Sequence, residues 1–178
     1  MANLTRKLEK LIKPAALVGL FLLVMVVGFC KEARSEVTIE GGAGLLSGQF
    51  SGGGTIMVTE RWGGPYKSRY AIGMGYIYKQ HVLDRSRDYY NLDENLFVLA
   101  QRRVSFDLRG CQHDCISLGL GVAYFNSTNR ALGSNFTAAL SVEFRPTDRW
   151  SLNLRHFSNA GSAAPNMGQD MITIGYTF

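Results

Sequence analysis

The C-terminal segment 171–178 alternates strictly between two kinds of side chain and ends on an aromatic residue. One row is apolar or aromatic and the other is mostly small or polar: Ile172, Ile174, Tyr176 and Phe178 against Met171, Thr173, Gly175 and Thr177. A period of two is that of a β-strand whose two faces meet different surroundings. An apolar row facing hydrocarbon, backed by small and polar residues facing a narrow interior, is typical of a strand in a transmembrane β-barrel.

The same period recurs through the chain after residue 35, and no helical periodicity appears there. It predicts eight strands, each placed to within a few residues: 37–46, 54–62, 69–79, 92–106, 115–125, 135–145, 150–158 and 169–178. The expected fold is therefore all-β, an eight-stranded antiparallel transmembrane β-barrel with both termini at its periplasmic end. Trp62 and Trp150 would anchor that end in the membrane interface. Residues 80–91 are expected to form a polar external loop.

Charged side chains are expected inside this barrel. Glu143, Arg145, Asn153 and Arg155 lie on the polar rows of their strands. They would pair with one another in a narrow interior filled by side chains. A soluble β-sandwich would instead bury the apolar rows, but Tyr and Trp at strand ends and an export signal favour the membrane version.

The N-terminal 35 residues have the pattern of a signal peptide. Four basic residues precede an apolar run over 15–29, and Ala33-Arg34-Ser35 is a small-x-small cleavage site. The alternative is an uncleaved helical anchor, but the run is shorter than the roughly 20 residues that a spanning helix needs. Phe29 before Cys30 argues against a lipidated cysteine. We therefore expect a signal peptide over 1–35 and a barrel domain over 36–178.

Removing residues 1–35 changes the charge of the chain. They hold six of the 19 Lys and Arg and two of the 14 Asp and Glu, so residues 36–178 carry a net charge of +1. The basic character belongs mostly to the signal peptide, which leaves no argument for binding nucleic acid.

The two cysteines that remain, Cys111 and Cys115, are close in sequence. In an exported protein such a pair predicts a disulfide within a turn. Cys111, His113 and Cys115 could also be read as zinc ligands, but a short turn with no second cluster of ligands makes a weak zinc site. We expect the disulfide, and neither a metal nor a cofactor.

Three residues of the kinds found in hydrolytic triads fall on one outer patch of the predicted barrel. His156 and Ser158 continue the apolar row of Leu152 and Leu154, and Asp170 begins the apolar row of the last strand. Side chains two apart on one face start roughly 6.5–7 Å apart, which an imidazole and a hydroxyl can bridge. They could act as base, nucleophile and orienting acid. Alternatively, they are ordinary polar residues at the level of the lipid headgroups.

The sequence around these residues resembles the C-terminal signature of the outer-membrane lipid A 3-O-deacylase family. Arg-His-Phe-Ser-Asn-Ala-Gly at 155–161, followed by Pro-Asn-Met-Gly at 165–168, carries the resemblance, which is dense over 150–178 and collinear from about Ile116. It implies an eight-stranded barrel that hydrolyses the ester-linked acyl chain at the 3-position of lipid A. The family's catalytic His and Ser match His156 and Ser158. Its acidic member, usually Glu, matches Asp170, which is one methylene shorter.

The resemblance also implies roles for nearby residues. Asn159 matches an Asn that is a candidate oxyanion stabiliser, and the backbone N–H of Gly161 is a second candidate. Asn166 and Gly168 are interpreted as loop formers after Pro165.

Together these features predict an outer-membrane serine esterase with its site near the external leaflet. Lipid A or lipopolysaccharide is the implied substrate, outer-membrane lipid is the surrounding partner, and homodimer formation is an alternative to a monomer. Two other functions compete with this one. The first is a non-catalytic small barrel acting in adhesion or envelope stability, and the second is an esterase for another envelope lipid.

Overall fold

The computed structural model describes residues 36–46, 49–63, 68–83, 89–106, 115–129, 131–162 and 167–178, so the predicted signal peptide lies outside the described residues. The described strands are β1 (Glu36–Leu46), β2 (Gln49–Gly63), β3 (Ser68–Ile77), β4 (Gln80–Leu83), β5 (Tyr89–Leu92), β6 (Asn95–Phe106), β7 (Ile116–Phe125), β8 (Phe136–Phe144), β9 (Trp150–Ser158) and β10 (Gln169–Thr177). Within this part of the chain, no helix has the length and apolarity needed to cross a membrane.

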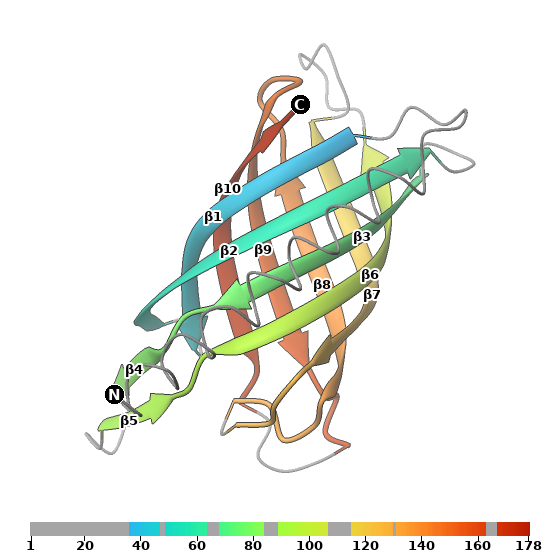
Figure 1. Cartoon of the computed structure of the whole chain (residues 1–178). Coiled ribbons are helices and arrows are strands. Elements are labelled where there is room, and N and C mark those ends of the chain that lie inside the picture. Colours follow the sequence, from blue (N-terminus) through green and yellow to red (C-terminus); the bar gives the residue numbers. More distant parts are fainter. Residues whose placement is uncertain are drawn as a thin grey trace, which may run out of the picture. The chain divides into compact units, whose positions relative to one another are not determined.

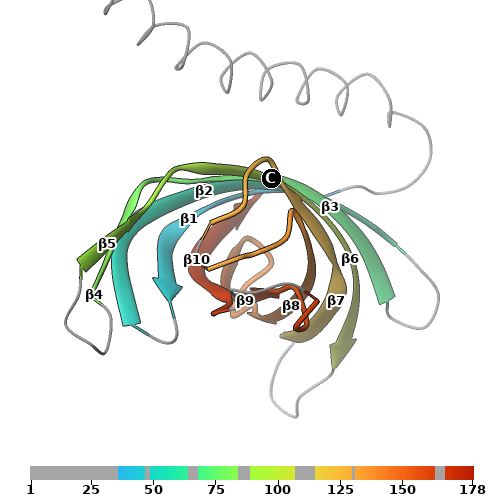
Figure 2. The ribbon, with the colours of Figure 1, turned by 90° about the horizontal axis from the view of Figure 1, so that it is seen from below.

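Eight of these strands form a closed antiparallel barrel, as the sequence predicted. The order around the barrel is β1-β10-β9-β8-β7-β6-β3-β2, and β1 pairs with both β10 and β2 to close it (Figures 1 and 2). We call the end where β1 begins and β10 finishes the terminal end, and the opposite end the distal end. The antiparallel order places Ser158, the last residue of β9, and Gln169, the first of β10, at the distal end.

Residues 80–91, predicted as a polar external loop, connect two barrel strands but contain strands of their own. The strands β4 and β5 pair there as a separate two-stranded sheet beyond the distal end of β3. Each strand is only four residues long, too short for its alternation to stand out from a polar segment. For the same reason Leu92, expected in the fourth barrel strand, belongs to β5, and β6 begins at Asn95.

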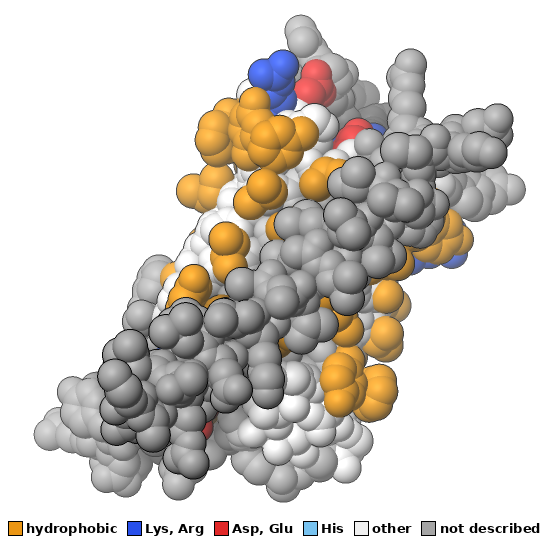
Figure 3. Space-filling view, viewed as in Figure 1, with side chains coloured by type: hydrophobic (Ala, Val, Ile, Leu, Met, Phe, Trp, Pro, Cys, Tyr) orange, Lys and Arg blue, Asp and Glu red, His pale blue; other side chains and the backbone are white. Residues whose placement is uncertain are grey.

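The outer surface of the barrel carries the apolar rows. Leu120 is 65% exposed, Val122 60% and Phe136 69%, whereas the alternate positions of their strands face inward and are mostly buried. Figure 3 shows apolar side chains spread over one side of the barrel wall. Aromatic rings meet near both ends: Trp150 packs on Tyr176 with centroids 5.1 Å apart at the terminal end, and Tyr124 packs on Phe136 at 5.0 Å at the distal end. This surface is that of a barrel that spans a membrane.

The interior near the terminal end is filled by paired charged side chains, as predicted, but among the four described residues named from the sequence only Arg145 and Glu143 contact each other, at 3.5 Å. The main partners come from strands that this prediction of pairing did not include. Arg155 donates from its two terminal nitrogens to the two Glu40 oxygens at 2.5 and 2.7 Å, and both side chains are fully buried. Glu143 pairs with Arg61 at 2.8 Å and Arg103 at 2.6 Å. Buried charges persist only when they are paired and hydrogen-bonded. The network therefore fixes Arg155, and with it the outward direction of the next residue, His156.

The interior near the distal end is apolar. The rings of Phe97, Phe125 and Phe157 pack together with centroids 5.2–5.3 Å apart. Gly75 leaves room for this cluster, because a Cβ there would lie 2.3 Å from the Phe97 ring. Phe157 is fully buried and lies between His156 and Ser158 in the chain. Its packing inside the barrel therefore holds both neighbours on the outer face.

We expect Phe157→Ala to destabilise the barrel by about 3–5 kcal/mol, since it removes a fully buried ring from a packed cluster. Phe157→Leu, which keeps much of the contact, should cost less than half as much. Urea unfolding of barrels refolded into lipid vesicles measures both variants. Equal losses in the free energy of unfolding for the two variants would contradict the view that packing of the Phe157 ring supports β9.

Candidate active site

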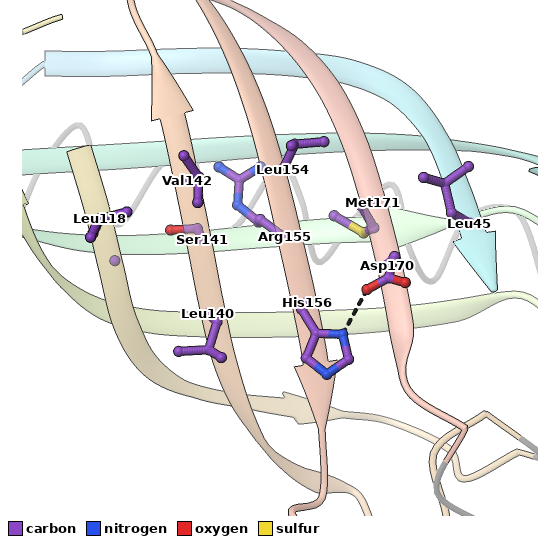
Figure 4. A pocket seen from close by; sticks show the side chains of 11 residues that line it. Leu45, Leu118, Leu140, Ser141, Val142, Leu154, Arg155, His156, Asp170 and Met171 are labelled. Atoms are coloured by element: carbon purple, nitrogen blue, oxygen red, sulfur yellow. Dashed lines mark hydrogen bonds and ion pairs between the residues drawn. The ribbon is translucent and has the colours of Figure 1, made fainter. Parts of the chain in front are cut away.

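His156 and Asp170 lie directly opposite each other on β9 and β10. The Nδ1 atom of His156 is 2.6 Å from Oδ1 of Asp170, with the side chains 45% and 30% exposed. Figure 4 shows the two side chains joined on the outer face of adjacent strands. The shorter Asp therefore reaches the imidazole, because strand pairing already brings the two residues into register.

This contact defines which imidazole nitrogen carries the proton. An ionised carboxylate can only accept a hydrogen bond, so Nδ1 of His156 is the donor. In the neutral ring the other nitrogen, Nε2, is then an unprotonated acceptor. That is the form in which a histidine can take a proton from a hydroxyl.

Ser158 follows two residues later on the same outward face of β9. It is half-buried and lies opposite Ala138 of β8. Its Oγ accepts a hydrogen bond from the backbone N–H of Ala160 at 3.1 Å. The structure thus brings His156 and Asp170 into contact across β9 and β10. It places Ser158 on the same face of β9 as His156.

The strand leads into a tight turn over residues 159–162. The Ser162 N–H donates to the Asn159 carbonyl at 3.0 Å. Ala160 and Gly161 both have positive φ values, 53° and 79°, a combination that occurs in turns of the type I′ class. Ala160 is the sole residue other than glycine with positive φ in the described part of the chain. Backbone of this kind is uncommon and concentrates at functional sites.

The two residues proposed as oxyanion stabilisers face each other in this turn. Asn159 is 4% exposed and faces the interior, and its side-chain oxygen accepts the Gly161 N–H at 3.1 Å. In this arrangement the Gly161 N–H is bonded to Asn159, so an oxyanion would have to displace that contact. Their roles stay predictions, and Asn166 lies outside the described residues.

An apolar groove of about 460 Å³ adjoins the His156–Asp170 pair. It runs over the outer faces of the neighbouring strands and is lined largely by leucine and valine: Leu45, Leu118, Leu140, Val142 and Leu154. The lining comes from β1, β10, β9, β8 and β7, which are consecutive around the barrel (Figure 4). The alternating pattern places Leu118, Leu140, Val142 and Leu154 on membrane-facing rows but gives no sign that they surround a groove, because the groove depends on how five strands pack side by side.

Gly168 is a second feature that sequence reasoning missed. Its place after Pro165 indicates only a loop former, yet a Cβ at this position would lie 2.7 Å from Cε1 of the His156 ring. Its φ is 76°, a region in which side chains are strained. Pro-Asn-Met-Gly signals a turn, and nothing in that signal indicates contact with a histidine twelve residues earlier.

Of the cysteine and histidine candidates for a zinc site, one is described. Cys115 is disulfide-bonded, while Cys111 and His113 lie outside the described residues. Among the described residues, no group of three or more His, Cys, Asp and Glu is arranged to hold a metal ion.

Comparison with known proteins identifies relatives. The model of the family described as "Lipid A 3-O-deacylase (PagL)" matches residues 56–178. The lipid A deacylase PagL of Bordetella bronchiseptica is 37% identical over 70 residues, covering 35% of this chain and 39% of the relative. The chain thus aligns with well under half of that relative's length.

Several solved structures are similar to this chain. The outer-membrane enzyme PagL is 21% identical with a TM-score of 0.46, covering 80% of this chain and 98% of that one. Neisserial surface protein A is 14% identical with a TM-score of 0.46, covering 83% and 98%. Ail of Yersinia pestis is 12% identical with a TM-score of 0.45, covering 83% and 100%.

The family match begins within β2, runs to the last residue and includes His156, Ser158 and Asp170. It spans well over half of the chain, and the closed barrel with an apolar outer wall agrees with it. This chain is an outer-membrane β-barrel that belongs to the lipid A 3-O-deacylase (PagL) family.

Proposed function

We propose that this protein is a serine esterase that hydrolyses the 3-O-linked acyl chain of lipid A. The observation that carries the proposal is the 2.6 Å contact between His156 and Asp170 on the outer face of the barrel. Ser158 lies on the same face of β9, two residues after His156. Membership of a family named for this reaction supports the choice of substrate. We also propose that residues 1–35 direct export.

The reaction follows from the roles of the three side chains. The Oγ of Ser158 attacks the ester carbonyl carbon, and its proton passes to Nε2 of His156. Asp170 holds the imidazole by Nδ1 and stabilises the positive charge that it gains. Collapse of the tetrahedral intermediate breaks the bond to the sugar oxygen, which takes the proton from His156. Water, activated by the same imidazole, then releases the fatty acid from Ser158.

The position of the site suits a substrate that is itself a membrane lipid. His156 and Asp170 lie near the distal end of the barrel, and the groove beside them is almost entirely apolar. An acyl chain in this groove would exchange hydrocarbon contacts with lipid for hydrocarbon contacts with leucine and valine. We propose that the distal end faces the cell exterior, so that lipid A of the outer leaflet reaches the site by lateral diffusion.

The site needs no second copy of the chain. His156 and Ser158 come from β9 and Asp170 from the adjacent β10, so a monomer contains all three groups. Homodimer formation is therefore not part of the proposed mechanism.

Mass spectrometry of lipid A from cells that express the full chain tests the function. We expect the loss of one 3-hydroxyacyl group from lipid A, with the free hydroxy fatty acid as the second product. Unchanged lipid A, together with release of fatty acid from membrane phospholipid, would favour an esterase for another envelope lipid. Unchanged lipids of both kinds would favour a non-catalytic barrel.

A further inference from the structure

The connection between β7 and β8, described over residues 126–129 and 131–135, places two apolar residues inside the distal end of the barrel. Ala131 and Leu132 are 0% and 1% exposed and belong to the same buried apolar cluster as Phe125 and Phe157. Loops usually run over a protein surface, so a connection with two fully buried residues is a fixed part of the structure. Its backbone can therefore position neighbouring groups.

Asn129 closes the turn that buries these two residues. Its side-chain Oδ1 accepts the N–H groups of Ala131 and Leu132 at 2.8 and 3.0 Å. The backbone N–H of Asn129 donates to the Leu132 carbonyl at 3.0 Å. An Asn side chain that accepts backbone N–H groups two and three residues ahead is a strong local determinant of turn shape. The direction of the Ala131 carbonyl therefore depends on Asn129.

The Ala131 carbonyl connects this turn to the candidate active site. It accepts the N–H of Gly168 at 3.1 Å. Gly168 in turn lies against the His156 ring: an added Cβ would be 2.7 Å from Cε1 and 3.5 Å from both ring nitrogens. Gly168 therefore lies beside the Cε1 edge of the imidazole, between Nδ1, which Asp170 holds, and Nε2.

We propose that the turn capped by Asn129 is a positioning element for His156, acting through the Ala131 carbonyl and Gly168. The inference rests on the proposed function, in which His156 is the base. The imidazole is 45% exposed, so few contacts restrain it. Asp170 fixes Nδ1, and Gly168 fixes the tilt of the ring that aims Nε2 at Ser158. Small misplacements of a catalytic group cost large factors in rate, so loss of this support lowers kcat.

Asn129→Ala and Asn129→Asp separate positioning from general stability. The alanine variant removes the acceptor for two N–H groups, and we expect it to lower kcat about tenfold with KM changed less than about twofold. The aspartate variant keeps an oxygen acceptor and should restore kcat to near the parent value. Thr147→Ala is the matched control. Thr147 Oγ1 also accepts two backbone N–H groups, those of Arg149 and Trp150 at 3.4 and 3.0 Å, but this turn lies at the terminal end of the barrel, away from His156. It should leave kcat unchanged.

A spectroscopic measurement tests the same idea without substrate. The Nδ1–H of His156, hydrogen-bonded to Asp170, should give a downfield proton resonance in the full-length barrel in detergent micelles, assigned by its loss in His156→Gln. We expect Asn129→Ala to broaden or shift this resonance, and Thr147→Ala to leave it in place. Gly168→Ala is the second variant: its added methyl meets the ring directly, so the resonance should change even if Asn129→Ala fails to fold.

The outcomes distinguish this inference from the proposed function. An unchanged kcat and resonance in a folded Asn129→Ala protein, or an unchanged resonance in Gly168→Ala, would overturn the positioning role and leave the esterase assignment intact. A fully active Ser158→Ala protein would overturn the esterase mechanism. In that case a perturbed His156 resonance in Asn129→Ala would still support the structural connection.

Discussion

Ser158→Ala is expected to reduce lipid A deacylation by roughly 10⁴- to 10⁶-fold, because it removes the atom that forms the acyl-enzyme. The barrel should fold normally, since Ser158 is at the last position of β9 on the outer face and has no part in the buried clusters. Release of 3-hydroxy fatty acid from purified lipopolysaccharide in detergent measures the rate. Heat-modifiable migration in gels reports the fold.

Ser162→Ala is the control for this prediction. Ser162 is exposed and lies four residues farther along, in the same connection between β9 and β10. Its loss should leave the rate within about twofold of the parent, since most surface substitutions have small effects. If Ser158→Ala kept full activity while folded, Ser158 would not be the nucleophile.

Asp170→Asn is expected to lower kcat by about 10²- to 10⁴-fold, since an amide cannot stabilise the imidazolium that forms during the reaction. Asp170→Ala should fall in the same range, because it removes the 2.6 Å contact to His156. Asp170→Glu should retain activity, since it keeps the charge and carries the side chain usual in the family that the sequence resembles. The initial rate of fatty acid release, measured at saturating substrate, checks all three.

Asp93→Asn provides the matched control for charge. Asp93 is exposed and lies between β5 and β6 at the same end of the barrel, so its neutralisation alters the local surface charge without touching the site. It should leave kcat unchanged. Equal rates for the parent and all three Asp170 variants would remove Asp170 from the mechanism.

The alternating rows predicted most of the fold because a barrel wall separates two very different environments. In β9, Leu152 and Leu154 alternate with Asn153 and Arg155, and the structure places the first pair outside and the second pair inside. The same alternation identified the outward face of His156. The hairpin of β4 and β5 escaped prediction because both of its strands are short and its composition is polar.

The sequence predicted that the three candidate residues lie on one face of the barrel, but it did not show that His156 and Asp170 are in contact. The alternation of side chains along a strand indicates which side of the barrel wall a residue faces. It was enough to place His156, Ser158 and Asp170 on the outer side. Contact between His156 and Asp170 depends on the register of β9 against β10, and the intervening segment leaves that register undetermined. The three-dimensional pairing settles it, and the shorter carboxylate then suffices.

The sequence by itself therefore determined the class of fold, the direction of side chains in the strands that alternate clearly, and the family that the chain resembles, because each of these depends on periodicity or on a local motif. The tertiary structure alone decided the groove beside the site, the aromatic cluster behind β9 and the contact of Gly168 with His156. The groove and the aromatic cluster join segments far apart in the chain, as with Leu118 and Leu45, and Gly168 is held in place by the distant Ala131 carbonyl. Such contacts depend on strand register and close packing, which a local pattern does not encode.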